Sequence, residues 1–448
     1  MKLHVAALVL FATALHATPP LVDHHQHIIS GQAAQLFNGP LPLPAMALPD
    51  DLARLMRLRA ERWDDEKGLA ELYSENAVAL RNYGQQFGWE RGRADVARLV
   101  SQTYARPFTI TPAAYRIDGS AGSIAANLTR GEGTPGRRHF GVIHFGLEKG
   151  SDGVWRIASE TFATPTATQQ EYGADQLIKA LDEAGIQRAV LLSVAGVYGG
   201  SVSFASVEGE PEEARYAKLR AENDWVAREA AKYPKRLVAF CSFNPLAAHA
   251  IPEIRRCKSA GFHGVKLHLE ESGIDLLDPE HVKTVRALFA ESNRLGLPIM
   301  VHPGNNQREG RARAKVLFDQ ILTATPDIVV QIAHLWGGND FSEQSNETLA
   351  AYAEYMQAKH PATKNLWFDM SESAMIAAWM GDRQTEVLNI IATRIRQIGI
   401  KRVLYGTDGP ALIGHMTPKD AWEQFRKLVP LTEEEFNTIA TNVAPYMK

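Results

Sequence analysis

Eight short apolar runs, separated by amphipathic stretches, constrain the fold of this chain more than any other feature of its sequence. Each run is apolar almost throughout rather than alternating, which is typical of strands in a parallel sheet that helices cover on both faces. The runs lie at residues 21–29, 188–194, 236–245, 264–269, 298–304, 329–336, 365–373 and 402–410. The stretches between them have helical spacing, as at Val285 and Leu288, and glycines such as Gly185 and Gly296 end them. Eight such units predict an α/β fold, a closed (β/α)8 barrel (TIM barrel) rather than an open doubly wound sheet.

One stretch is too long to be a barrel loop. Residues 30–174 lie between the first strand and the helix that begins near Asp175, where a short connection would suffice. Within residues 48–165, stretches with helical spacing lie at 51–74 and 93–105. Runs in which apolar and polar residues alternate follow at 108–117, 122–133, 137–149 and 153–163. Helices followed by an antiparallel sheet predict an inserted α+β domain with its own core. Residues 18–47 are then the first strand and a linker, and residues 166–448 are the rest of the barrel.

The N-terminal segment resembles a secretory signal. Residues 1–17 combine the basic Lys2 with an apolar stretch at 5–15 and a small-residue site at 12–14. We therefore expect an exported protein, periplasmic or secreted, and the alternative is a buried N-terminal strand of a cytosolic protein. No later run reaches the roughly 18 apolar residues that a membrane helix needs, so no membrane anchor is expected.

The composition excludes several classes of protein. With 45% hydrophobic and 22% charged residues, the chain has the composition of an ordinary globular protein. Its formal net charge of −3 offers no basic field for a phosphate backbone, so nucleic acid is not an expected partner. The two cysteines, Cys241 and Cys257, are too few for a four-thiolate zinc site. We expect them to be buried free thiols, with a disulfide as the alternative.

Potential metal ligands follow the strands of the predicted barrel. His25 and His27 stand two apart on the first strand, so both imidazoles project from one face. The further candidates lie near the carboxyl ends of strands four, five, six and eight, and they are Lys266, His302, His334 and Asp408. Singly, each has a plain alternative, such as a solvated pair, a packing histidine or a turn former. Together, six side chains at the strand ends of one barrel predict a site for zinc, or for divalent iron, nickel or manganese.

The ordered motifs resemble those of a known family. VDHHQH, GVKLHL, IMVHPG, IAHLWGG and LYGTDGP follow one another as in the amidohydrolase superfamily, in its amidohydrolase-related branch that also holds barrel decarboxylases. The resemblance covers residues 20–30 and 172–448. The ion ligands that it implies are His25, His27, His302 and Asp408, with His334 as a second-metal ligand or as a catalytic base and electrophile.

Lys266 has two interpretations. It lies where two-metal members of the superfamily carry a carboxylated lysine that bridges the ions, so the resemblance implies one or two ions, most naturally Zn²⁺. Carbamylation needs a neutral amine, which burial beside cations can provide. The alternative is a lysine that contacts the substrate or a neighbouring carboxylate.

The inserted part resembles the NTF2-like or SnoaL-like cone fold. Trp63-Asp64-Asp65, the segment LAELYSENAVAL and the run GVWRIASETFA match that fold in kind. The resemblance covers residues 48–165 and implies a pocketed or dimerising module without a fixed chemistry. Because the insertion leaves the barrel after strand one, it emerges on the face that carries His25 and His27. Either a lid over the site or a homodimer contact is therefore possible.

Asp408 and His334 are the predicted catalytic residues. A divalent ion lowers the pKa of a water molecule towards about 7, and a carboxylate such as Asp408 can take its proton and return it to the leaving group. His334 can polarise the developing oxyanion if it does not bind metal. Residues that follow strand ends and are candidates for contact with the substrate, each with a plain surface-loop alternative, are Tyr198, Glu270, Arg308, Arg311 and Trp336. Arg308 and Arg311 are the best candidates for a clamp on a substrate carboxylate.

Three functions fit this pattern. The first is an exported metal-dependent hydrolase that acts on an amide, ester or lactone carbonyl of a small molecule. The second is a metal-dependent non-oxidative decarboxylase of a small carboxylic acid; Lys266 and export both favour hydrolysis over it. The third is a non-catalytic protein that binds a small molecule, and the intact set of ligands argues against it.

Overall fold

The structure of the chain is a computed structural model. It describes residues 18–35, 44–63, 65–83, 86–103, 108–130, 140–166, 170–199, 211–304, 309–337, 341–378, 383–409 and 416–448. The predicted signal segment at 1–17 lies outside the described residues.

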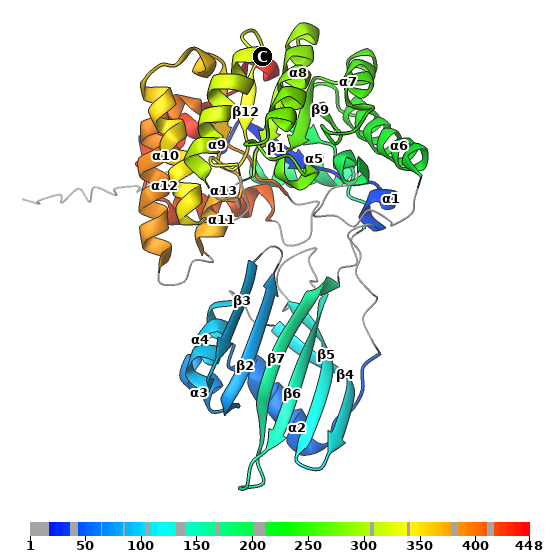
Figure 1. Ribbon diagram of the computed structural model, residues 1–448, viewed down its shortest axis with the longest axis vertical. Coiled ribbons are helices and arrows are strands. Elements are labelled where there is room, and N and C mark those ends of the chain that lie inside the picture. Colours follow the sequence, from blue (N-terminus) through cyan, green and yellow to red (C-terminus); the bar gives the residue numbers. More distant parts are fainter. Residues whose placement is uncertain are drawn as a thin grey trace, which may run out of the picture.

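The larger part of the molecule is a parallel eight-stranded barrel (Figure 1). In sheet order its strands are β1 (Val22–His27), β8 (Arg188–Leu192), β9 (Leu237–Ser242), β10 (Gly264–His268), β11 (Ile299–His302), β12 (Val330–Ile332), β13 (Leu366–Asp369) and β14 (Val403–Leu404). Backbone hydrogen bonds join the two ends of this sheet, from His24 N to Tyr405 O (3.0 Å) and from Asp408 N to His25 O (2.7 Å). The predicted (β/α)8 barrel is confirmed.

Helices surround the barrel and connect its strands. They are α1 (Gly31–Ala34), α5 (Ala174–Ala184), η2 (Ala195–Gly199), α6 (Glu212–Ala231), α7 (Ala250–Ser259), η3 (Glu270–Ser272), α8 (Pro279–Leu295), α9 (Gly310–Val316), η4 (Leu317–Ile321), η5 (Leu322–Ala324), α10 (Glu343–Gln357), η6 (Pro361–Thr363), α11 (Ser373–Ala378), α12 (Gln384–Ile398), η8 (Ile400–Arg402), α13 (Pro418–Leu428), α14 (Glu433–Thr441) and η9 (Pro445–Met447). Helix α8 shows why these stretches fold as they do. Asp278 caps its N-terminus, Val285 and Leu288 are buried, and Gly296 ends it at a φ of 65°.

The interior of the barrel is layered. The layer near the amino ends of the strands is apolar and contains Val22, Val238 and Met300 from three of the strands together with Met447. Gly264 is needed here, because a Cβ at that position would lie 2.4 Å from the ring of Phe240. The histidines and Asp408 lie towards the carboxyl ends of the strands, where barrel enzymes carry their active sites.

The inserted part is a six-stranded sheet with three helices. Its strands, in sheet order, are β3 (Gln86–Arg91), β2 (Tyr73–Tyr83), β7 (Trp155–Thr166), β6 (Phe140–Lys149), β5 (Ala121–Arg130) and β4 (Phe108–Asp118), and its helices are α2 (Asp50–Glu61), α3 (Glu66–Ala70) and α4 (Arg93–Thr103). Only the β2 and β7 pair is parallel. A separate apolar core lies between the sheet and the helices. The predicted α+β insertion is confirmed.

Two predictions within the insertion need correction. The helical stretch expected at 51–74 breaks into α2 and α3, and its end at Tyr73 already belongs to β2. The strands β2 and β3 were not predicted. Along β2, Ala77 and Ala79 are buried while Val78 and Leu80 are exposed, which is the two-residue period of a strand on a half-covered sheet.

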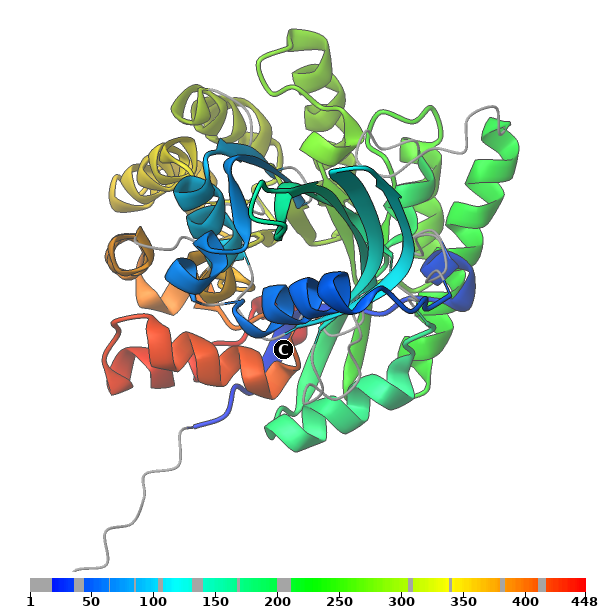
Figure 2. The ribbon, with the colours of Figure 1, turned by 90° about the horizontal axis from the view of Figure 1, so that it is seen from below.

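The insertion lies beyond one end of the barrel. Figure 1 shows its sheet below the barrel, while the end of the chain marked C lies at the opposite end. Figure 2, turned by 90°, shows the insertion in front of the ring of barrel helices. This is the end to which β1 leads, so the insertion lies on the side of the strand ends that carry His25 and His27.

Cys241 and Cys257 form a disulfide, and the expectation of two free thiols is therefore wrong. The cause is their tertiary position. Cys241 on β9 faces the helix layer, Cys257 lies on the buried face of α7, and their Cα atoms are 6.4 Å apart. That separation is within the range that a disulfide bridges.

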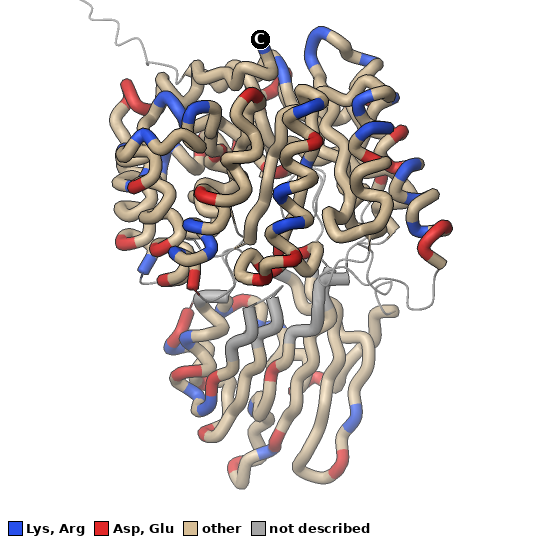
Figure 3. The backbone as a smooth tube through the Cα atoms, turned by 45° about the horizontal axis from the view of Figure 1, so that its top comes forward, with Lys and Arg blue, Asp and Glu red and all other residues tan. Residues whose placement is uncertain are grey.

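The surface carries both signs of charge. Lys and Arg are interspersed with Asp and Glu over the barrel helices, whereas most positions along the strands of the insertion are uncharged (Figure 3). Among the described helices, none is long and apolar enough to span a membrane.

Candidate metal centre

Five histidines form a closed ring at the carboxyl ends of the barrel strands. Around the ring, the distances between imidazole centroids are 5.5, 6.4, 5.4, 4.9 and 4.9 Å, in the order His25, His27, His268, His302, His334 and back to His25. Four of these histidines were predicted from the sequence. The fifth, His268, was not, although it lies two residues after Lys266 and therefore on the same face of β10.

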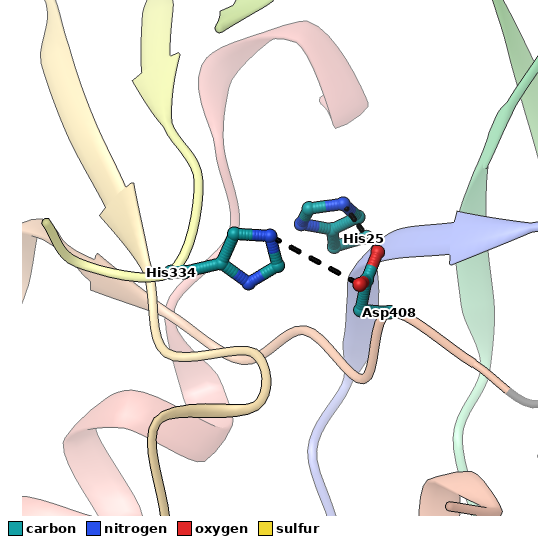
Figure 4. Close-up of side chains that lie close together, drawn as sticks. All are labelled: His25, His334 and Asp408. Atoms are coloured by element: carbon teal, nitrogen blue, oxygen red, sulfur yellow. Dashed lines mark ion pairs between the residues drawn. The ribbon is translucent and has the colours of Figure 1, made fainter. Parts of the chain in front are cut away.

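Asp408 lies against this ring. Its carboxylate is 2.8 Å from His25 Nε2, 3.1 Å from His27 Nε2 and 4.0 Å from His334 Nε2. Figure 4 shows His25 and His334 converging on the two carboxylate oxygens. Each of these three residues offers one ligand atom within 4.8 Å of the others. The structure thus brings together residues from β1 and from the segments that follow β12 and β14.

Lys266 lies in the same space. Its side chain is fully buried, with Nζ 3.1 Å from His25 Nε2 and 3.8 Å from Met300 Sδ. Among the described residues, no carboxylate lies within 4.0 Å of this Nζ. Burial lowers the pKa of Lys266. The amine therefore lies against His25, and Asp408 and Asp369 act on its charge only from a longer distance.

Backbone strain is concentrated around this site. His334, Leu335, Glu372 and Asp408 have positive φ values of 53° to 65°, and they are four of the six such non-glycine residues in the described chain. Residues with side chains seldom adopt this conformation, and it persists where the surrounding structure enforces it. The turn at His334 and Leu335 also explains why β12 ends at Ile332, earlier than the predicted run.

Asp369 is a functional residue that the sequence analysis missed. It ends β13, is fully buried, and accepts a hydrogen bond of 3.2 Å from His25 Nδ1. It also accepts bonds from the backbone N–H of His334 (3.2 Å), from Gln331 Nε2 (2.7 Å) and from the hydroxyl of Ser371. A carboxylate behind a histidine orients the imidazole as a metal ligand. Its place at the end of an apolar run was the available signal.

A family model described as amidohydrolase matches residues 164–442, more than half of the chain. The chain belongs to the amidohydrolase family. The match covers the barrel from just before α5 to the end of α14, and it leaves out β1 and most of the insertion.

Individual relatives of this amidohydrolase are distant. A 2-amino-3-carboxymuconate-6-semialdehyde decarboxylase of Dictyostelium discoideum is 22% identical over 293 residues, which is 61% of this chain and 76% of that protein. The apo form of IDCase from Metarhizium anisopliae is 14% identical, with a TM-score of 0.43 over 96% of this chain and 97% of that one. For the insertion, an NTF-2 like protein of unknown function from Shewanella oneidensis is 15% identical, with a TM-score of 0.22 over 25% of this chain and 97% of that one.

The imidazoles of the histidine ring differ in charge. Burial lowers the pKa of His27 to about 4 and those of His302 and His334 to about 3, so these rings are neutral at pH 7. Burial also lowers the pKa of His25, but the carboxylates of Asp369 and Asp408 outweigh it and raise the pKa to about 9. Neutral imidazoles with free lone pairs are the form that binds metal.

The donor set fits a divalent ion. His302 Nε2 and His27 Nδ1 are buried and have no hydrogen-bond partner within the described part of the chain. A buried nitrogen in that state costs about 1–3 kcal/mol unless something binds it. Burial raises the pKa of Asp408, but His25 and His27 outweigh it and hold the pKa well below its usual value, so a carboxylate is available. Imidazole and carboxylate donors suit zinc and the neighbouring divalent metals.

The predicted substrate contacts have mixed outcomes. Glu270 lies beside the site, since its carboxylate packs over Gly304, two residues after His302. Trp336 follows His334, is fully buried and packs edge-on against Phe341. Tyr198 is buried in η2, which follows β8. Arg308 lies outside the described residues.

Arg311 is not brought to the site. Its guanidinium binds Glu347 (3.1 Å) and Glu354 (2.5 Å) on the neighbouring helix α10. About half of its side chain is exposed. Arg311 therefore belongs to a network of ion pairs between outer helices, and its guanidinium is not available to a substrate carboxylate.

Proposed function

We propose that this amidohydrolase is a metal-dependent hydrolase that uses an activated water molecule on an amide, ester or lactone carbonyl of a small molecule. The observation that carries the proposal is the position of Lys266. It is the one lysine among the described residues that is buried within the histidine ring, and no described carboxylate pairs with it. A neutral buried amine can react with CO2, forming a carbamate as its N–H proton leaves, and a carbamate is a bridging ligand.

The remaining ligands divide into two groups. Asp408 Oδ1 lies 2.8 Å from His25 Nε2 and 3.1 Å from His27 Nε2, and these three residues would hold a first ion. His302 and His334, whose ring centroids are 4.9 Å apart, would hold a second. A divalent ion in this site supplies Lewis acidity, which makes water acidic and a carbonyl carbon electrophilic. We propose Zn²⁺, because it accepts imidazole and carboxylate ligands and leaves an open coordination position in catalytic sites.

Asp408 moves the proton in this scheme. Its Oδ1 is bound by His25 and His27, while Oδ2 faces His334 at 4.0 Å. Oδ2 accepts the proton of the attacking water and then gives it to the departing amine or alcohol oxygen. Asp369 keeps the His25 ring in place throughout, through the bond to Nδ1.

A second candidate is non-oxidative decarboxylation of a small carboxylic acid. The observation that favours it is the Dictyostelium relative, which is a decarboxylase and aligns over 61% of this chain. In that reaction a single ion suffices, and Lys266 would contact the substrate as an unmodified amine.

One experiment separates the two functions. Purified protein is assayed on panels of amides, lactones and small carboxylic acids, with acid release followed by titration and CO2 release followed by isotope labelling. Hydrolysis predicts acid without CO2, about two ions per chain, and loss of activity in Lys266→Ala that short carboxylic acids partly restore. The matched control is Lys283→Ala on the exposed surface of α8, which should change nothing. CO2 release with one ion per chain would establish the decarboxylase instead.

We also propose that the protein is exported. The segment at 1–17 supports this, and a disulfide is stable in an oxidising compartment. N-terminal sequencing of protein from the periplasmic or extracellular fraction should begin between residues 15 and 18. Intact protein that begins at residue 1 in the cytosolic fraction would contradict export.

A further inference from the structure

A segment at the floor of the barrel is built into its interior. Residues 443–448, the floor segment, lie at the end of the barrel opposite the insertion (Figure 1). Ala444 N donates to His24 Nε2 at 3.2 Å, and the guanidinium of Arg188 donates to the carbonyl of Met447. The side chain of Met447 is 1% exposed and belongs to the apolar interior layer. The floor segment is therefore part of the barrel core.

A continuous chain of hydrogen bonds runs from the floor segment to the histidine ring. The hydroxyl of Tyr446 donates to Gln331 Oε1. Gln331 Nε2 donates to Asp369 Oδ2 at 2.7 Å, and Asp369 accepts from His25 Nδ1 at 3.2 Å. His25 Nε2 at the other edge of the ring faces Asp408. Gln331 and Asp369 are both fully buried, so water does not compete for these bonds.

The chain has a defined direction. An amide side chain has an oxygen that accepts and a nitrogen that donates. Because Tyr446 donates to the oxygen of Gln331, the amide nitrogen must face Asp369. A reversed amide would set its oxygen against the carboxylate of Asp369 and leave two buried groups unsatisfied. Asp369 in turn accepts from Nδ1 of His25, which leaves Nε2 as the nitrogen available to a ligand.

We propose that Tyr446 is a positioning residue of the metal centre, acting through Gln331 and Asp369 on the orientation and tautomer of His25. This inference rests on the proposed metal site. It places a determinant of the site at the opposite end of the barrel, at a residue that Gln331 and Asp369 separate from His25.

The test compares three single variants. Tyr446→Phe removes the first donor of the chain. Asp369→Asn replaces one of the two carboxylate oxygens, which accept from Gln331 Nε2 and His25 Nδ1, with an NH2 group that only donates. Tyr355→Phe is the matched control, since it removes a tyrosine hydroxyl that donates to Asp319 (2.9 Å) on the outer helices. Zn²⁺ affinity is measured by competition with a chelator. The ¹⁵N shifts of the His25 imidazole, which report the protonation and hydrogen bonding of each ring nitrogen, are measured in metal-free protein.

We expect Asp369→Asn to weaken Zn²⁺ binding by about 10- to 100-fold and Tyr446→Phe by about 10-fold, with the Tyr355→Phe control unchanged. In the Asp369→Asn background, Tyr446→Phe should cause no further loss, because the chain is already broken. Both variants should alter the His25 shifts.

Two results would overturn the inference. One is wild-type Zn²⁺ affinity and unaltered His25 shifts in Tyr446→Phe. The other is a full second loss of affinity when Tyr446→Phe is added to Asp369→Asn, since that would mean a route other than Asp369. Altered His25 shifts in a protein that binds no Zn²⁺ would instead leave the positioning chain standing and remove the proposed metal function.

Discussion

The barrel and the insertion each bury a polar cluster, and the two clusters differ in composition and in how their charges are paired. In the insertion, Arg59 on α2, Glu160 on β7 and Tyr73 on β2 are all buried. Arg59 Nε lies 2.8 Å from Glu160 and 3.0 Å from Tyr73, and the Tyr73 hydroxyl also donates to Glu160. One cation faces one anion, and the neutral hydroxyl bridges them.

The barrel cluster is not built from one such ion pair. It gathers five imidazoles, the amine of Lys266 and the carboxylate of Asp408, and it leaves His302 Nε2 without a hydrogen-bond partner within the described residues. A buried cation and anion that pair with each other can hold a fold in one arrangement. Buried imidazole nitrogens without a hydrogen-bond partner are instead available to bind a metal ion. On this comparison we interpret the insertion cluster as structural and propose the barrel cluster as the metal site.

The largest change in stability that we expect comes from breaking the buried ion pair of the insertion. Arg59→Met leaves the carboxylate of Glu160 buried without its cation, which should lower the free energy of unfolding of the insertion by about 3–5 kcal/mol. Chemical denaturation followed by tryptophan fluorescence measures this. Ion content and activity of the barrel should be unchanged while the insertion stays folded.

Two controls sharpen this prediction. Arg57→Met on the same helix removes an exposed pair with Glu61 and should cost less than about 1 kcal/mol. Adding Glu160→Leu to Arg59→Met should recover much of the lost stability, because no buried charge is then left. Equal losses in Arg57→Met and Arg59→Met would show that the buried cluster is not structural.

The next largest change in stability should be a gain rather than a loss. His302→Leu removes the unsatisfied nitrogen, so the metal-free barrel should become more stable by about 1–3 kcal/mol. The same variant should lose bound metal and activity by more than the roughly 100-fold that removal of an outer partner costs. Thermal unfolding in a chelator and elemental analysis give both readouts. A metal-free His302→Leu protein that is less stable than the parent would mean that His302 serves packing and not ligation.

The sequence revealed the barrel and most of the ring for one physical reason. The carboxyl ends of the parallel strands all lie at one end of the barrel. Potential metal ligands at these strand ends therefore come close together in space, even when they are hundreds of positions apart in the sequence. His25, Lys266 and Asp408 were predictable on that ground. Asp369 could have been found by the same rule, since it also ends a run.

Other features depend on contacts that no local pattern carries. Gln331 and Tyr446 look like ordinary chain residues until the barrel brings them together across 115 positions. The disulfide between Cys241 and Cys257 depends on how α7 packs on β9. In the insertion, the strand β2 was mistaken in part for helix, because its first residues continue an apolar spacing that also fits a helix.

The smallest effect on stability concerns the exposed face of the insertion. Trp89 is 67% exposed and Leu80 is 39% exposed, and the two are cross-strand neighbours on a sheet that carries few charges (Figure 3). We expect this face to pair with that of a second chain, since a symmetric dimer uses the same patch twice. Replacing both residues by Lys should convert the dimer to a monomer in sedimentation, with stability changed by less than about 0.5 kcal/mol and activity retained.

The alternative for the insertion is a lid over the barrel mouth. Deleting residues 48–165 and joining the ends with a short Gly-Ser linker tests it. A lid predicts that the oligomeric state persists while small, poor substrates gain rate relative to large ones. A wild-type protein that sediments as a monomer would contradict the dimer.

The central claim is that the barrel cluster is a metal centre, and counting ions tests it most directly. Elemental analysis of the purified full chain should find about two divalent ions per molecule, and His25→Ala should contain none and have no activity although circular dichroism shows a folded barrel. Full activity in metal-depleted His25→Ala protein would contradict the claim.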